Sequence, residues 1–163
     1  MTTTDHLGGR LEERALLVGF LDWYRGVIAN KVAGLSLEDA TRVMTPSGLS
    51  PMNIVGHLAA CEIGWFFEKF DGGGVDPFWE PYGEFELQGD ETVESMLALY
   101  AEACGRSRAI VERTESLDQL SVVAHDVWGR VTLRWVLLHM LEETARHAGH
   151  LDLMREQLDG KTG

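Results

Sequence analysis

Basic residues are scarce in this sequence. Its 163 residues include 14 lysines and arginines against 26 aspartates and glutamates, which leaves a net charge of −12. A chain this acidic repels the phosphate backbone of nucleic acids unless basic residues gather in a patch. No such patch is present, because the densest basic stretch holds only Arg106, Arg108 and Arg113. We therefore expect no nucleic-acid partner.

Cysteine is also scarce, and long apolar runs are absent. Cys61 and Cys104 are the only two cysteines and form no Cys-x-x-Cys pair, which excludes a disulfide scaffold and is typical of a reducing compartment. The sequence contains no run of about 18 apolar residues, the length that a membrane span needs. No apolar stretch follows Met1, so we expect no secretory leader. These absences predict a cytoplasmic protein that does not insert into membranes.

The alternation of polar and apolar residues that marks β-strands is nearly absent. Apolar residues instead recur with a helical period in four long segments, at about 7–31, 51–70, 91–115 and 132–158. A long connection at 75–90, rich in proline, glycine and aromatic residues, separates the second segment from the third. The sequence therefore predicts an all-α four-helix bundle that forms a single domain over residues 1–163.

The fourth segment carries a stripe of polar side chains within an arc of about 80° on a helical wheel: His139, Glu143, His147 and His150. The rest of this helix is largely apolar, as in a buried helix, and buried polar groups need partners. The stripe therefore predicts a site inside the bundle.

Glu143 and His147 are four residues apart, which brings their β-carbons to about 5–6 Å of each other on one face. Two such side chains can hold one metal ion if another helix supplies a third ligand. His57 is the candidate, because small residues around it allow a neighbouring helix to approach. Two histidines and one carboxylate are a common catalytic zinc set with a fourth position open. The alternative is a hydrogen-bonded polar cluster without metal.

Two runs resemble the DinB-like family of four-helix-bundle metalloproteins: SPMNIVGHLAACE at 50–62 and LRWVLLHMLEETARHAGH at 133–150. The resemblance implies one divalent ion, zinc or nickel, held by His57, Glu143 and His147. Glutamate at the first position of the fourth-helix pair is similar to the mycothiol-dependent maleylpyruvate isomerase branch, in which two histidines and a glutamate hold zinc.

This resemblance implies a metal-dependent S-transferase or isomerase that uses a low-molecular-weight thiol of the mycothiol or bacillithiol type on a small-molecule substrate. A bound cation would favour the thiolate form of such a thiol. The same site could activate water in a hydrolase instead. Two other interpretations remain open. The chain could be a non-catalytic protein that binds a metal or small ligand, or a structural module with an empty polar cluster. The apolar faces of the bundle also suggest a homodimer.

Two further residues are candidates for a catalytic role. His150 stands where many DinB-like proteins carry glutamine, which makes it a candidate substrate or supporting group. Arg146 lies beside the stripe and could hold a substrate carboxylate, or else pair with Glu142 or Glu143. His139 and Cys61 are each one turn from a proposed ligand, and the sequence leaves their part in the site open.

Overall fold

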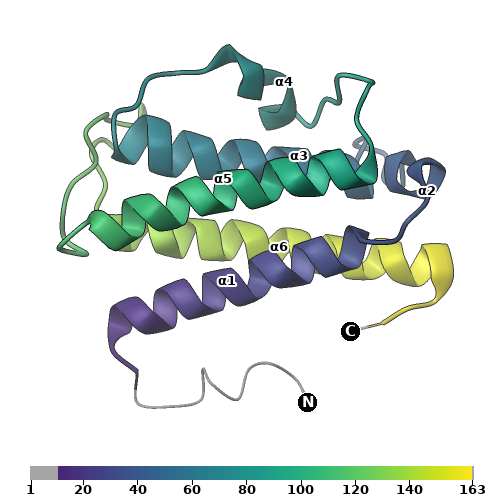
Figure 1. Cartoon of the computed structure of the whole chain (residues 1–163), viewed down its shortest axis with the longest axis horizontal. Helices are drawn as coiled ribbons and strands as arrows, with labels where there is room; N and C mark the ends of the chain where they lie inside the picture. Colours follow the sequence, from purple (N-terminus) through teal and green to yellow (C-terminus); the bar gives the residue numbers. More distant parts are fainter. Residues whose placement is uncertain (1–10, 163) are drawn as a thin grey trace.

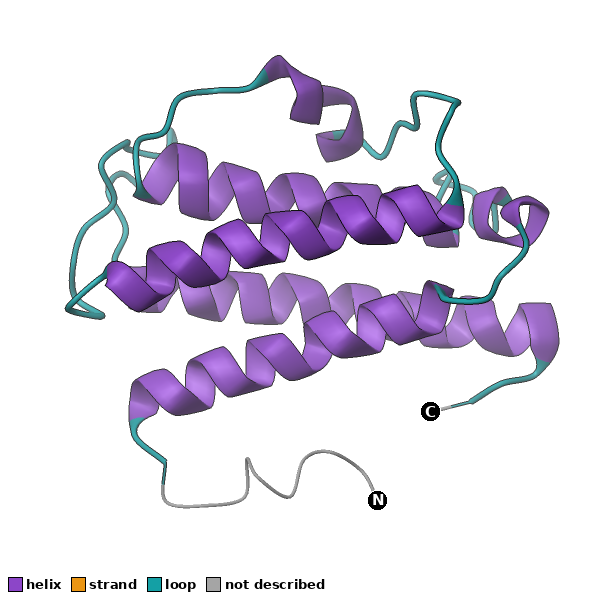
Figure 2. Cartoon of the chain, viewed as in Figure 1, coloured by secondary structure: helices purple, strands orange, loops and turns teal. Residues whose placement is uncertain are grey.

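The computed structural model describes residues 11–162. Four long helices make up most of this part of the chain: α1 (Glu13–Val32), α3 (Pro51–Glu62) with its π-helical continuation η1 (Ile63–Phe70), α5 (Val93–Arg113) and α6 (Leu133–Asp159). Within the described residues no strand forms, which confirms the all-α class (Figure 2). The first helix begins at Glu13, whereas its predicted start at residue 7 lies outside the described residues.

The direction of the helices explains the long connection between the second and third segments. In Figure 1, α3 and α5 run in the same direction and lie side by side, while α1 and α6 run the opposite way beneath them. A chain that joins two parallel neighbours must travel back along the bundle, so a tight turn cannot follow α3. The return segment carries η2 (Pro77–Trp79) and α4 (Glu80–Gly83), which packs over α3.

Local capping chemistry sets the ends of the two helices that carry the candidate ligands. Before α3, the Ser50 side chain accepts a hydrogen bond from the Asn53 amide at 3.3 Å, and Pro51 occupies the first helical position. Before α6, the Thr132 side chain accepts from the Trp135 amide at 3.2 Å. Gly160 ends α6 with a left-handed φ of 74°, which glycine adopts without a steric penalty. The same kind of cap, at Ser36, begins the short helix α2 (Leu37–Thr41).

The buried core between the helices includes an ion pair that spans α1 and α3. Arg25 donates to both carboxylate oxygens of Glu62, at 2.7 and 2.6 Å, and Glu62 is 0% exposed. Glu62 therefore points away from His57, as its spacing on the helix predicts. None of the helices within residues 11–162 is long and apolar enough to cross a membrane.

Candidate metal centre

His57 enters the centre from α3 and is held by its ring nitrogens. Its Nδ1–H donates to the backbone oxygen of Gly83 at 2.8 Å, because a carbonyl oxygen can only accept. Its Nε2 then faces α6, where it lies 3.2 Å from Oε1 of Glu143. A ring whose Nδ1 is held in this way keeps Nε2 available to a metal ion.

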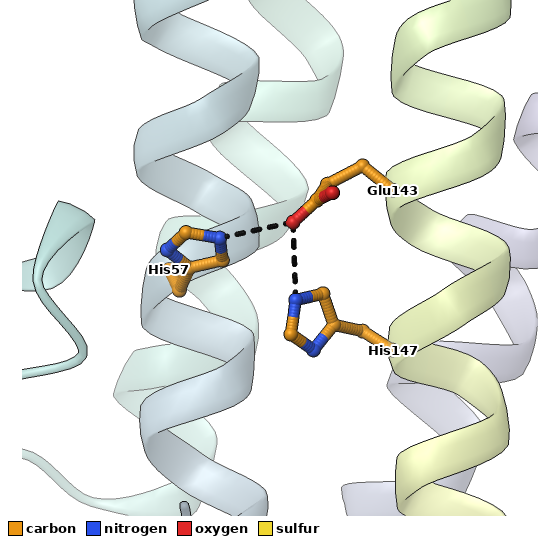
Figure 3. Close-up of side chains that lie close together, drawn as sticks. All are labelled: His57, Glu143 and His147. Atoms are coloured by element: carbon orange, nitrogen blue, oxygen red, sulfur yellow. Dashed lines mark hydrogen bonds and ion pairs between the residues drawn. The ribbon is translucent and has the colours of Figure 1, made fainter. Parts of the chain in front are cut away.

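Glu143 and His147 face α3 from successive turns of α6. His147 Nε2 lies 3.1 Å from the same Oε1 of Glu143, so both imidazoles converge on one carboxylate oxygen (Figure 3). His147 is buried, and the other two side chains are half-buried. The structure thus brings the three predicted residues together from two helices.

This arrangement fits a metal ion in its donor set and its spacing. The donor atoms of His57, Glu143 and His147 all lie within 4.8 Å of one another. Donors at zinc bond lengths of about 2.0–2.1 Å in a tetrahedron are separated by roughly 3.3 Å, close to the 3.1 and 3.2 Å found here. Small outward shifts of the side chains would open the position for the ion.

The groups behind the three residues also match those of metal sites, where ligands are oriented by hydrogen bonds. Arg146 donates to Oε2 of Glu143 at 2.9 Å, which leaves Oε1 for the histidines. His147 Nδ1 lies 3.3 Å from His150 Nδ1. Burial, together with the charges of His147 and Arg146, lowers the pKa of His150. A neutral His150 can accept, at its Nδ1, a hydrogen bond from the Nδ1–H of His147.

Charges within the centre shift two further pKa values. Hydrogen bonds from His147 and His57 hold the pKa of Glu143 well below its ordinary value, so this side chain is ionised at neutral pH. Burial alone would lower the pKa of His57, but its contacts with Cys61 and Glu143 outweigh burial and raise the pKa to about 10. In the absence of metal, the centre therefore holds a proton where a cation would sit.

A cavity of about 450 Å³ along α3 and η1 reaches His57, the one residue of the centre that lines it. His57 and Cys61 lie in its wall, and the Cys61 thiol is 3.4 Å from Nε2 of His57. Farther along, the wall contains Trp65 and His125 together with four charged side chains: Glu68, Lys69, Asp76 and Glu80. A small molecule in this partly acidic cavity would therefore approach the centre from the His57 side.

A second cavity of about 530 Å³ lies between α1, α5 and α6, away from the three residues. Most of its lining surface is apolar, and its three arginines already have partners: Arg25 pairs with Glu62, Arg108 pairs with Asp22, and Arg14 donates to the backbone oxygens of Val111 and Glu115. It therefore carries no cluster suited to chemistry.

His139, whose part in the site the sequence left open, lies in a cluster of aromatic side chains. Its ring stacks on Trp135 with centroids 5.0 Å apart and meets the edge of Trp65 at 4.6 Å. These contacts draw it toward η1 rather than toward His57. One turn of helix and the 80° arc of the stripe are enough to give it different neighbours from Glu143.

The comparison with known protein families identifies the family of this chain. A family model described as mycothiol-S-transferase matches residues 16–160. The chain belongs to the mycothiol-S-transferase family. This finding confirms the resemblance to the DinB-like, mycothiol-related proteins noted in the sequence. A search among curated proteins found no match to the chain.

Two residues of the connection at 75–90 contact His57 in the centre. The sequence alone did not assign either of them a role there. Gly83 supplies the carbonyl that holds His57, and no pattern in the connection at 75–90 pointed to it. Phe85 stacks on the His57 ring with centroids 3.9 Å apart and an angle of 11°. Of the four aromatic residues in the connection, Phe85 alone stacks on His57, whereas Phe78 packs on Trp79 and Tyr82.

Proposed function

We propose that this protein is a metal-dependent thiol S-transferase in which His57, Glu143 and His147 hold one divalent ion, most naturally zinc. The observation that carries the proposal is the convergence of three metal-ligating side chains, one of which, His57, lines a cavity, in a chain of the mycothiol-S-transferase family. Two histidines and one carboxylate leave a fourth position for an exchangeable group, as catalytic zinc sites do.

The residues of the chain divide the work as follows. His57 and His147 present their Nε2 atoms, and Glu143 presents Oε1. A divalent cation held there would supply the positive charge that favours the thiolate form of a thiol at neutral pH. Arg146 and His150 contact ligands rather than the cavity, so we assign them to positioning Glu143 and His147.

The cavity favours a thiol without negative charge. The lining of the cavity contains three carboxylates but only one lysine, Lys69. Such a wall repels an anionic thiol and offers acceptors to hydroxyl groups. Mycothiol joins its N-acetylcysteine, which carries the sulfur, to a neutral, hydroxyl-rich sugar–inositol unit, whereas bacillithiol and glutathione carry carboxylates. We therefore propose mycothiol, or a similarly neutral thiol, as the co-substrate.

The reaction would form a bond between the thiol sulfur and an electrophilic carbon while the leaving group departs from that carbon. The proton of the thiol would pass to solvent or to the leaving group. The electrophile would enter through the same cavity, where Trp65 and His125 present aromatic rings. A single cavity that holds both reactants would bring sulfur and carbon into contact, which is how an enzyme lowers the entropic cost of such a step.

The test is a transfer assay on zinc-loaded protein with a fluorogenic alkylating electrophile and equal concentrations of mycothiol, bacillithiol or glutathione. The proposal predicts turnover with mycothiol that is lost in Glu143→Ala and His147→Ala. His139→Ala is the matched control on the same helix, because His139 lies in the tryptophan cluster, and it should retain activity. Zinc binding without turnover with any thiol would favour a non-catalytic metal-binding protein.

A further inference from the structure

Phe85 combines an unusual backbone conformation with a close contact to the metal centre. Its φ is +62°, and it is the one non-glycine residue among the described positions with positive φ. A bulky side chain disfavours this region, so neighbouring structure must hold it there. Its ring lies flat on His57, with centroids 3.9 Å apart, and 5.7 Å from His147.

The strained turn is anchored to α3 next to His57. A Cβ atom on Gly56 would come within 2.9 Å of the Tyr82 ring, so the absence of a side chain at Gly56 allows Tyr82 to seat α4 against α3. Tyr82 is also tied down by its hydroxyl, which donates to Glu91 at 2.9 Å. The turn then continues to Phe85, whose N–H donates a hydrogen bond to the carbonyl oxygen of Tyr82 at 3.0 Å.

We propose that the turn from Gly83 to Phe85 is a clamp that positions His57 for the metal ion, with Phe85 as a positioning residue. This inference rests on the metal centre proposed above. The χ2 torsion of histidine is broad, so an unsupported ring can turn Nε2 away from Glu143. Gly83 holds Nδ1 by a hydrogen bond, and Phe85 holds the plane of the ring by stacking. Together the two contacts fix both the direction and the plane of the imidazole.

Phe85 also stands apart from the path of the substrate. The described residues that line the 450 Å³ cavity include His57 and Gly83 but not Phe85. Within the clamp, Gly83 therefore borders the cavity, whereas Phe85 contacts the His57 ring from outside that lining. The positive φ is the expected mark of such a role, because strain persists where function depends on the geometry.

Substitutions at Phe85 separate a clamp from simple packing. Phe85→Gly removes the ring and also relieves the strain, since glycine adopts positive φ freely. Phe85→Tyr keeps an aromatic face over His57. Phe78→Ala is the matched control, because Phe78 lies in the same connection and packs on Trp79 and Tyr82 rather than on His57.

Two measurements are made on each variant of the full chain. Zinc affinity is obtained by competition with a chromophoric chelator, and the His57 ring protons of the metal-free protein are followed by NMR. We expect Phe85→Gly to bind zinc about 10–100-fold more weakly, as for other residues that orient a ligand. Its His57 ring protons should lose the upfield shift that a stacked phenyl ring imposes, while Phe85→Tyr and Phe78→Ala stay close to the unsubstituted protein.

Zinc affinity that is unchanged in Phe85→Gly, with only a lower unfolding temperature, would overturn the clamp and leave the metal centre standing. An unshifted His57 ring in the unsubstituted protein would overturn it as well. Failure of the unsubstituted protein to bind zinc would overturn the proposed function, and the clamp's role in metal binding with it.

Discussion

The Nδ1 atoms of His147 and His150 lie 3.3 Å apart, on successive turns of one face of α6. His147 is buried, so the nitrogen that does not face Glu143 needs a partner, and His150 provides it. The same relationship holds for His57 and Gly83. Both histidines of the centre therefore have their Nδ1 atoms engaged and their Nε2 atoms directed at Glu143.

We expect His150→Ala to weaken zinc binding about 10–100-fold, because His147 loses the group that orients its ring. His150→Gln should recover much of the affinity, since the amide oxygen can accept the same hydrogen bond. Chelator competition measures both variants. Equal affinities for His150→Ala and the unsubstituted protein would remove His150 from the centre.

Arg146→Ala frees Oε2 of Glu143 and should weaken zinc binding, by less than the loss of His150 because Arg146 is largely exposed. The matched control is Glu142→Gln, which removes the other carboxylate that Arg146 contacts without altering Glu143. Zinc affinity measured in both variants should fall only in Arg146→Ala. A larger loss in Glu142→Gln would show that the surface pair, not the contact with Glu143, matters.

Zinc binding should release a proton near neutral pH. The pKa of His57 in the metal-free centre is raised to about 10, so the ring is protonated at pH 7 and its proton must leave when Nε2 binds the ion. The apparent affinity should therefore rise with pH, by about tenfold per unit for one proton, until the pKa is reached. Calorimetry in buffers of different ionisation enthalpy counts the protons. An affinity that does not change between neutral and mildly alkaline pH would contradict this assignment.

The Arg25–Glu62 pair predicts an effect on stability without an effect on the metal. Glu62→Ala removes the buried partner of the Arg25 guanidinium, which then keeps only the partly exposed Asp22, and we expect it to cost about 3–5 kcal/mol of unfolding free energy in urea titrations. Replacing both residues, as Arg25→Met with Glu62→Leu, should restore most of that loss, and zinc affinity should be unchanged in the double variant. A loss from Glu62→Ala of no more than about 1 kcal/mol, as for an exposed pair, would contradict the burial of this ion pair.

The sequence predicts those parts of the centre that depend on local geometry. Glu143 and His147 share a face because positions four apart on a helix always do. The caps at Ser50 and Thr132 are likewise local signals, and they place the starts of α3 and α6 correctly.

Local sequence patterns do not predict contacts that depend on tertiary packing. Gly83 and Phe85 reach His57 only because Tyr82 is seated at Gly56, and no spacing within the connection encodes that seat. His139 lies in the same arc of the helical wheel as Glu143 and His147, yet it packs on Trp135 and Trp65. The metal, the homodimer, the single domain and the cytoplasmic location stay predictions.

The most direct test of the account is the metal content of protein purified without a histidine tag, measured by elemental analysis. The unsubstituted chain is compared with His57→Ala and His147→Ala after equal exposure to zinc, and circular dichroism verifies that the helices persist. The account predicts about one zinc ion per chain in the unsubstituted protein, and little in either variant. A chain that takes up no divalent ion, or variants that hold as much zinc as the unsubstituted protein, would contradict it.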